Sequence, residues 1–197
     1  MRPFRLGLTG SIGTGKSTTA RFFAAEGLPV WDADAAVHRL YAPGGAAGPA
    51  LAADFPLAVG PGGVDRVALK AAIAADPQAL AQIEAVVHPL VAADRAAFLA
   101  AATADIVVLD IPLLFETGAE TQMDATLTVT CPPELQRARV LARPGMTPQM
   151  FDTILAKQMP DAEKRARATH VIETLGLTAV QESVRALIAY LRGCRNA

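Results

Sequence analysis

Short apolar runs alternate along the chain with longer segments whose apolar positions recur with helical spacing. The helical pattern covers residues 17–26, 65–102, 134–142, 147–159 and 177–191, and a short basic helix begins at Asp161. The apolar runs, which we expect to be strands, are residues 4–9, 28–31, 106–109, 126–130 and 170–172. Strands that alternate with helices predict an α/β fold with a mostly parallel sheet and helices on both of its faces.

Two prolines and one segment of unusual composition modify this pattern. Asp76 before Pro77 is typical of a helix start. His88 before Pro89 predicts an interruption, because the residue that precedes a proline disfavours the helical backbone. Residues 42–63 are rich in Ala, Gly and Pro. This segment is either partly loop or a reflection of the Ala and Gly content of the whole chain, and the sequence leaves both interpretations open.

Length and composition exclude several classes of protein. The chain has 197 residues, 52% of them hydrophobic, which is enough for a domain with its own core and too apolar for a disordered chain. Its net charge of −1 argues against a nucleic-acid partner. No apolar run reaches the ~20 residues of a membrane span, and the first residues do not resemble a cleaved signal. Cys131 and Cys194 match no disulfide framework or metal spacing, so we expect a reducing cytoplasm.

The basic residues are unevenly distributed. Of the 18, 14 are Arg and only four are Lys, at positions 16, 70, 157 and 164. Residues 131–170 contain seven basic and four acidic side chains, a net of +3, while the remainder of the chain has a net of −4. A local cationic stretch of this kind suits a bound polyphosphate, whose charges it would neutralise.

Residues 10–17 read G-S-I-G-T-G-K-S and match the phosphate-loop pattern G-x-x-x-x-G-K-[ST] completely. The preceding strand and the following helix are the context that this motif requires. Backbone N–H groups of Gly13, Thr14 and Gly15 are expected to face the phosphates, because glycine allows the tight turn. Lys16 is expected to reach the β- and γ-phosphates, Ser17 to ligate Mg²⁺, and Thr18 to contact the α-phosphate. The loop therefore predicts ATP or GTP with Mg²⁺.

Carboxylates follow two other strands at the same sheet edge, where ligands of such sheets bind. Asp32 and Asp34 lie two residues apart, so one can accept a proton from a hydroxyl nucleophile while the other holds the acceptor or Mg²⁺-bound water. One of them is alternatively the cap of a helix that starts nearby. Asp110 is either a carboxylate near Mg²⁺ or a simple strand-end residue, and both interpretations stay open.

Further polar residues fit phosphoryl transfer. Arg139 and Arg143 are four residues apart and share a helix face, where their guanidinium forks suit a transferring phosphoryl group. Glu116 follows an apolar run, Leu113 to Phe115, and His88 precedes a proline. A switch GTPase would need the guanine-reading string N-K-x-D, which the sequence lacks. A small-molecule kinase is therefore favoured over a nucleotide-dependent switch.

Taken in order, these segments resemble the dephospho-coenzyme A kinase family. The matching strings are L-T-G-S-I-G-T-G-K-S at 8–17, D-A-D at 32–34, H-P-L at 88–90, P-L-L-F-E at 112–116, the spacing of Gln136, Arg139 and Arg143, and Gln158 before Lys164, Arg167 and residues 171–172. The departures are Ser11 where Gly is frequent, Thr169 where Asp is common, and Thr174 where Asn is common near the expected adenine site.

The resemblance implies a particular reaction and site. It implies transfer of the γ-phosphate of ATP to the ribose 3′-hydroxyl of dephospho-coenzyme A, with Asp34 as the base and Asp32 assisting. The acceptor site would also contain His88, Leu113, Phe115 and Glu116. Lys16 and Arg143 would take part in catalysis, and Arg139 and Arg143 would close over ATP. A kinase for another small metabolite is the alternative.

The resemblance also implies an architecture. It is a P-loop kinase-like three-layer α/β/α fold with a helical substrate-binding insertion and a lid. The nucleotide-binding core would comprise residues 1–34, 104–142 and 169–197, the substrate domain residues 35–103, and the lid with its adjoining helix residues 143–168. We expect a small-molecule substrate, no nucleic-acid or membrane partner, and a monomer or weak oligomer.

Overall fold

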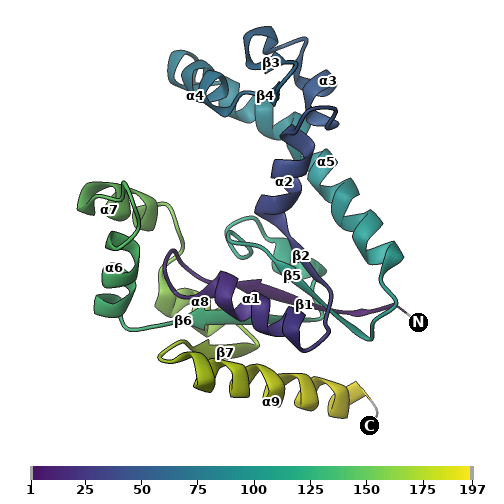
Figure 1. Cartoon of the computed structure of the whole chain (residues 1–197), viewed down its shortest axis with the longest axis vertical. Coiled ribbons are helices and arrows are strands. Elements are labelled where there is room, and N and C mark those ends of the chain that lie inside the picture. Colours follow the sequence, from purple (N-terminus) through teal and green to yellow (C-terminus); the bar gives the residue numbers. More distant parts are fainter. Residues whose placement is uncertain (1, 196–197) are drawn as a thin grey trace. The chain divides into compact units, whose positions relative to one another are not determined.

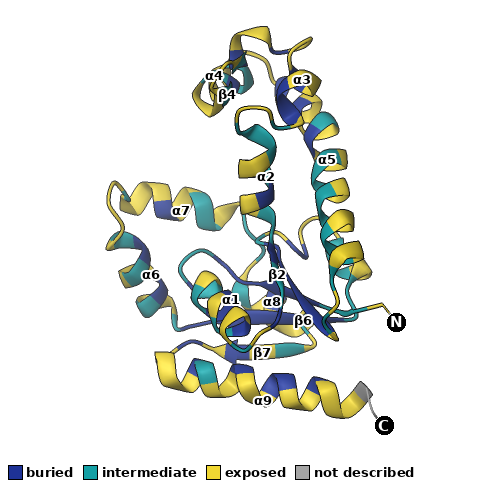
Figure 2. Cartoon of the chain, turned by 45° about the vertical axis from the view of Figure 1, so that its right-hand side comes forward, coloured by how far each residue is buried: buried dark blue, intermediate teal, exposed yellow. Residues whose placement is uncertain are grey.

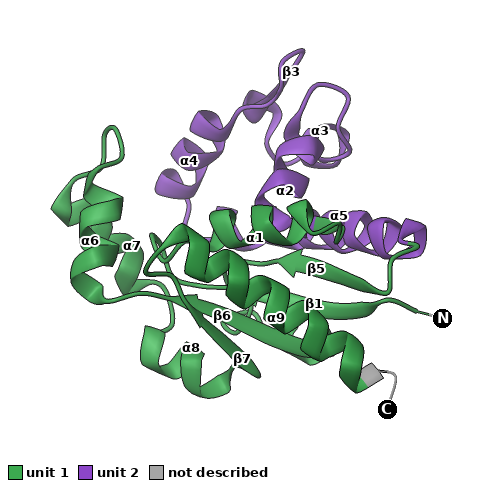
Figure 3. Cartoon of the chain, turned by 60° about the horizontal axis from the view of Figure 1, so that its bottom comes forward, with its two compact units in different colours: residues 1–30, 103–197 green, residues 31–102 purple. Residues whose placement is uncertain are grey.

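The protein consists of two compact units connected twice by the chain. The computed structural model describes residues 2–195, and its helices and strands are labelled in Figure 1. One unit comprises residues 1–30 and 103–197, and the other comprises residues 31–102 (Figure 3). The second unit is thus an insertion into the first, and each unit is described by itself.

A five-stranded sheet forms the centre of the first unit, and the chain passes from the first unit into the second within its edge strand β2 (Val30–Asp32). Its strand order is β2-β5-β1-β6-β7, and the pairs β1–β5, β1–β6 and β6–β7 are parallel. All five predicted strands are confirmed, with small shifts at their ends. Their bounds are β1 (Phe4–Thr9), β2 (Val30–Asp32), β5 (Ile106–Asp110), β6 (Ala125–Thr130) and β7 (His170–Glu173).

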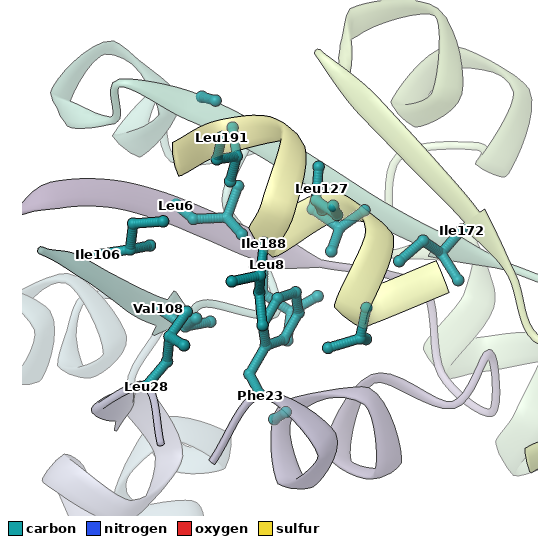
Figure 4. Packing of buried hydrophobic residues seen from close by; sticks show 14 of the residues in the cluster. Leu6, Leu8, Phe23, Leu28, Ile106, Val108, Leu127, Ile172, Ile188 and Leu191 are labelled. Atoms are coloured by element: carbon teal, nitrogen blue, oxygen red, sulfur yellow. The ribbon is translucent and has the colours of Figure 1, made fainter. Parts of the chain in front are cut away.

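Two helices cover one face of this sheet. They are α1 (Lys16–Ala25) and α9 (Leu177–Arg195), and they also contact each other. Alternate residues of the strands, such as Leu6, Val108 and Leu127, point into this layer and meet Phe23 of α1 (Figure 4). Figure 2 shows that α9 is buried along one side and exposed along the other, as its amphipathic pattern predicts.

The other face of the sheet is covered by α8 (Asp161–Arg167) and by the segment that follows β5. Gly7 of β1 lies so close to this segment that a Cβ atom there would come within 2.8 Å of the Met123 side chain. Every residue of β5 is buried, as expected for a central strand covered on both sides. The predicted three-layer arrangement is therefore confirmed. The remaining elements of this unit are α6 (Pro133–Leu141), α7 (Pro148–Ala156) and the 3₁₀ turn η2 (Ala119–Gln122).

The inserted unit is mainly helical and has a hydrophobic core of its own, which includes Leu51, Phe55, Ile83 and Val87. The segment 42–63 is partly loop, which is one of the two interpretations that the sequence left open: short elements alternate in it with turns at residues 42–46, 52–55 and 61–62. Its elements, with the flanking helices, are α2 (Ala33–Tyr41), α3 (Ala47–Leu51), the 3₁₀ turn η1 (Pro56–Ala58), the antiparallel pair β3 (Val59–Gly60) and β4 (Gly63–Val64), α4 (Arg66–Ala75) and α5 (Ala79–Ala101).

Two predicted helix boundaries are wrong in this unit. Helix α5 continues through Pro89, because residues on both sides of the proline, such as Val87 and Val91, pack against the same core. This packing compensates for the single backbone hydrogen bond that proline removes. The start near Asp76 also differs, since the Asp76 carboxylate accepts the Gln78 N–H at 2.8 Å and the helix begins only at Ala79.

Asp161 lies where the sequence predicts the start of the short basic helix. It is the first residue of α8, and its carboxylate accepts a hydrogen bond of 2.7 Å from the Thr130 hydroxyl at the end of β6. This bond joins α8 to the sheet. No helix within residues 2–195 is long and apolar enough to cross a membrane.

The core packing predicts that a leucine-to-alanine substitution affects stability far more at a buried site than at an exposed one. Leu127→Ala, at a side chain with 0% exposure in β6, is expected to lower the free energy of unfolding by about 2–5 kcal/mol, because it leaves a cavity. Leu177→Ala, at a side chain 68% exposed in α9, is the matched control and is expected to change it by no more than about 0.5 kcal/mol. Urea unfolding followed by circular dichroism measures both. Equal effects would contradict the assigned core.

Candidate active site

The loop between β1 and α1 has the backbone shape of a phosphate-binding loop. Gly13 and Gly15 have φ angles of 80° and 95°, in the left-handed region that favours glycine. A Cβ atom at Gly10 would lie 2.6 Å from the Val129 side chain, so this position has no room for one. Gly15 also precedes α1, and no side chain caps that helix. The first N–H groups of α1 are therefore available to an anion, and the helix dipole favours its charge.

The side chains of the loop differ in exposure. Ser17 is exposed and Thr18 is half-buried, whereas the Thr14 side chain is buried and its hydroxyl donates to the Ser11 carbonyl at 2.8 Å. The Thr14 N–H also donates to the Ser11 carbonyl, at 3.2 Å, so a phosphate would have to share or replace that longer contact.

Lys16 forms an ion pair with Asp110, at 2.5 Å between Nζ and Oδ1. Asp110 is the last residue of β5 and is 1% exposed, so its negative charge lies inside the protein beside the loop. A buried carboxylate needs such a partner, because burial without one is costly. The sequence left the role of Asp110 open, and the structure pairs it with the lysine of the phosphate loop.

Two glutamines hold the backbone of Ile12 from both sides. The Ile12 N–H donates to Oε1 of Gln158 at 2.9 Å, and the Ile12 carbonyl accepts from Nε2 of Gln136 at 2.7 Å. Gln136 lies in α6 and Gln158 in the connection between α7 and α8. Two segments far from the motif in sequence thus fix the middle of the loop, where the backbone polar groups would otherwise lack partners.

Arg139 and Arg143, which the sequence places on one helix face, differ in their surroundings. The Arg139 guanidinium donates to the hydroxyl of Thr174 at 2.9 Å and to its carbonyl at 2.6 Å. Arg143 follows α6, is exposed, and has no side-chain partner among the described residues. The neighbouring Arg137 pairs with Asp152 of α7 at 3.3 Å, which links α6 to α7.

Glu116 forms an ion pair of 2.7 Å with Lys164 of α8, whose side chain is 0% exposed. The same Glu116 oxygen accepts the Met159 N–H at 2.8 Å, and Lys164 also donates to the Pro112 carbonyl at 3.3 Å. Burial by itself would raise the pKa of Glu116, but the hydrogen bonds from Lys164 and the Met159 N–H outweigh it and lower this pKa. Glu116 is therefore held in its ionised form.

The apolar residues beside Glu116 face different surroundings. Leu113 is largely exposed, whereas Phe115 is buried and the Arg167 guanidinium lies 5.0 Å from the centre of its ring. Of the two apolar residues predicted for the acceptor site, Leu113 therefore offers an exposed surface, and Phe115 does not.

The remaining candidates lie in the inserted unit. Asp32 caps α2, since its carboxylate accepts the Ala35 N–H at 3.0 Å, while Asp34 is exposed in the first turn of that helix. His88 is exposed on α5, which packs against α2. Asp94 of α5 accepts hydrogen bonds of 2.7 Å from Trp31 of β2 and from Arg39 of α2. It therefore joins α5 to both of these elements.

The sequence did not reveal the contacts that three of these side chains make, namely Gln136, Gln158 and Lys164. Gln136, Gln158 and Lys164 appeared only as parts of matching strings. The scarcity of lysine was a usable signal for Lys164, because two of the four lysines, at positions 16 and 164, form buried or half-buried ion pairs beside the candidate site. Nothing in the pattern of Gln136 and Gln158 reveals that they hold the same residue.

A parallel sheet with a glycine loop at the carboxyl end of its central strand, a helix after the loop, and a lysine and arginines around it define the class of phosphate-loop kinases. A family model described as dephospho-CoA kinase (CoaE) matches residues 4–179. The chain belongs to this family.

Relatives agree with this assignment. A dephospho-CoA kinase from Cereibacter sphaeroides is 68% identical over 197 residues, which cover 100% of both chains. One from Ruegeria pomeroyi is 59% identical over 189 residues, 96% of each chain. Among solved structures, the protein TT1252 from Thermus thermophilus is 39% identical with a TM-score of 0.85, covering 97% of this chain and 99% of that one.

The ion pair of Glu116 predicts a pH-dependent contribution to stability. Because the pKa of Glu116 is lower in the folded protein than in the unfolded chain, its stabilising effect is complete above the unfolded value of about 4.3 and is lost as the pH falls through the folded value. Glu116→Gln is expected to cost about 2–3 kcal/mol at pH 7, because it leaves the buried Lys164 charge without its carboxylate.

Urea unfolding at several pH values measures this contribution. The difference between the wild type and Glu116→Gln is expected to shrink as the pH falls below about 4. The exposed Glu182→Gln in α9 is the control and is expected to change stability by no more than about 0.5 kcal/mol. A difference for Glu116→Gln that stays constant from pH 7 to pH 3 would show that the pair does not act through the charge of Glu116.

Proposed function

We propose that the chain transfers the γ-phosphoryl group of ATP to the ribose 3′-hydroxyl of dephospho-CoA, which makes it an enzyme of CoA biosynthesis. The observation that carries this proposal is family membership over residues 4–179 together with a complete and correctly shaped phosphate loop. The relatives that bear the name dephospho-CoA kinase cover the whole chain, which favours this substrate over another small metabolite.

The residues of the first unit are suited to hold ATP. Backbone N–H groups of Gly13, Thr14 and Gly15 and of the start of α1 would bind the phosphates. Thr18 stands in the first turn of α1 for the α-phosphate. Lys16 lies at the loop and would contact the β- and γ-phosphates while Asp110 keeps its ammonium in place. Arg139 would bind phosphate oxygens of ATP, and Arg143 would also contact the phosphoryl group that is transferred.

A Mg²⁺ ion bound with ATP fits this site. Among the described residues, no three or more His, Cys, Asp or Glu side chains gather into a metal site. Mg²⁺ bound to a nucleotide does not need such a group, because phosphate oxygens and water fill most of its coordination. The exposed hydroxyl of Ser17, after the lysine of the loop, would be its protein ligand. When bound, the ion would neutralise charge that builds up on the phosphates.

Asp34 is the residue that we assign as the base. The Asp32 carboxylate caps α2, whereas Asp34 is exposed in the first turn of that helix. From the first turn of α2, Asp34 would accept the proton of the ribose 3′-hydroxyl as that oxygen bonds to the γ-phosphorus. The bond from the γ-phosphorus to the bridging oxygen breaks at the same time, and ADP leaves. Asp32 would assist by fixing the backbone that carries Asp34.

The resemblance assigns four side chains to the acceptor, namely His88, Leu113, Phe115 and Glu116. His88 and Leu113 are exposed, and the ionised Glu116 is held by Lys164. These three side chains would contact the acceptor, and the buried Phe115 would stabilise the segment that carries Leu113 and Glu116. Within residues 143–168, the lid would be residues 143–157 and α8 would be its adjoining helix, because α8 contributes the fully buried Lys164 and contacts β6.

The cellular setting follows from the substrate and the composition. A small-molecule acceptor requires no nucleic-acid or membrane partner. Cys131 and Cys194 are free thiols, which suits a reducing cytoplasm. We assign the protein to the cytoplasm as a monomer or weak oligomer.

The assignment of the base predicts a large change in turnover. Asp34→Asn is expected to lower kcat with dephospho-CoA by about 10²–10⁴-fold and to leave the KM for ATP nearly unchanged, because the amide cannot accept the proton. Asp54→Asn, at an exposed aspartate of the same unit, is the control and is expected to retain wild-type turnover. A coupled assay of ADP release measures both variants.

The same assay tests the substrate. Dephospho-CoA is expected to give a much larger kcat/KM than adenylate, shikimate, gluconate or pantothenate. Comparable turnover of any of these would contradict the assigned acceptor, and unchanged turnover of Asp34→Asn would remove Asp34 from the role of base.

A further inference from the structure

Thr174 follows β7. Asparagine is common at this position in the family that the sequence resembles, near the expected adenine site. Instead of facing solvent, the Thr174 side chain is inside the protein, with 4% of the residue exposed. Three parts of the nucleotide site meet at this one residue, namely the phosphate loop, the end of β6 and Arg139.

The hydroxyl of Thr174 is fully used by these neighbours. It accepts a hydrogen bond of 2.9 Å from Arg139 and donates to the Thr14 carbonyl of the phosphate loop at 2.6 Å. The Thr130 carbonyl at the end of β6 lies 3.2 Å from the same oxygen and also accepts the Thr174 N–H at 2.8 Å. A hydroxyl has one proton to donate, and the short distance gives it to Thr14.

The backbone of Thr174 contributes a second contact to Arg139. Its carbonyl accepts from Nη2 at 2.6 Å while its hydroxyl accepts from Nη1. Two parallel contacts fix both the position and the plane of the guanidinium. The side chain also packs against the loop, since a Cβ atom built on Gly15 would lie 3.1 Å from the Thr174 hydroxyl oxygen.

We propose that Thr174 is a positioning residue of the ATP site, which orders Arg139 and the Thr14 peptide before the nucleotide binds. This inference rests on the proposed role of Arg139 in binding ATP. A long arginine side chain loses much conformational freedom when it binds a ligand, and a partner that orders it beforehand removes that cost from the binding step. The effect of Thr174 therefore belongs to ATP affinity, and neither the acceptor nor the chemical step depends on it.

The test compares variants that keep or lose the hydroxyl. Thr174→Val retains the shape and is expected to raise the KM and the Kd for ATP about tenfold, because it leaves the Thr14 carbonyl without its donor and Arg139 with one acceptor fewer. The kcat and the KM for dephospho-CoA are expected to stay within about threefold of the wild type. Thr174→Ser restores the hydroxyl and is expected to bring the KM for ATP back to within about threefold.

Thr178→Val, at an exposed threonine of α9, is the matched control and is expected to leave all constants unchanged. An unchanged KM for ATP in Thr174→Val would overturn the proposal. So would a Thr174→Ser variant as impaired as Thr174→Val, or a parallel rise in the KM of both substrates. Should Thr174→Val fail to fold, Thr174→Ala lacks the same hydroxyl and carries the same expectation.

The Arg139→Met variant distinguishes a failure of the role proposed for Thr174 from a failure of the role proposed for Arg139. Thr174→Val is expected to raise the KM for ATP less in the Arg139→Met background than in the wild-type background, because the two residues act together. An equal rise in both backgrounds would show that Thr174 does not act through Arg139. An unchanged KM for ATP in Arg139→Met alone would instead remove Arg139 from the ATP site.

Discussion

The backbone of the phosphate loop has to serve two opposite demands. Its N–H groups toward the ligand must stay available, while the polar groups on its inner side must find partners within the protein. The inner groups of Ser11, Ile12 and Thr14 are paired with the hydroxyl of Thr14, with the amides of Gln136 and Gln158, and with the hydroxyl of Thr174. Most of these partners come from segments well outside the motif, so the loop depends on the surrounding fold.

The same segments place the charges around the loop. Helix α6 carries both Gln136, which holds the loop, and Arg139, which Thr174 orders beside it. The connection before α8 makes two contacts. The side chain of Gln158 accepts the Ile12 N–H of the phosphate loop, and the Met159 N–H donates to the Glu116 carboxylate. The buried Lys164 fixes Glu116 in turn. The phosphate loop and the carboxylate proposed for the acceptor are therefore parts of one connected framework in the first unit.

Much of the fold was predictable, because the signals that specify it are local. The continuous apolar run of β5 and the glycine loop after β1 predict the sheet and its ligand-binding edge. Helix α5 was not predictable at Pro89, since packing on both sides of the proline overrides its local preference. In the candidate site the motif residues were predictable by type and spacing. The pairing of Lys16 with Asp110, and the roles of Gln136, Gln158 and Thr174, arise from tertiary contacts that sequence spacing does not encode.

The central claim is that this framework directs the γ-phosphoryl group of ATP to one hydroxyl of dephospho-CoA. The most direct measurement incubates the protein with ATP, Mg²⁺ and dephospho-CoA and locates the new phosphate in the product by ³¹P and ¹H nuclear magnetic resonance. The account predicts a phosphomonoester on the ribose 3′-oxygen, formed in equal amount with ADP. A phosphate on another oxygen, or ADP released without a phosphorylated acceptor, would contradict it.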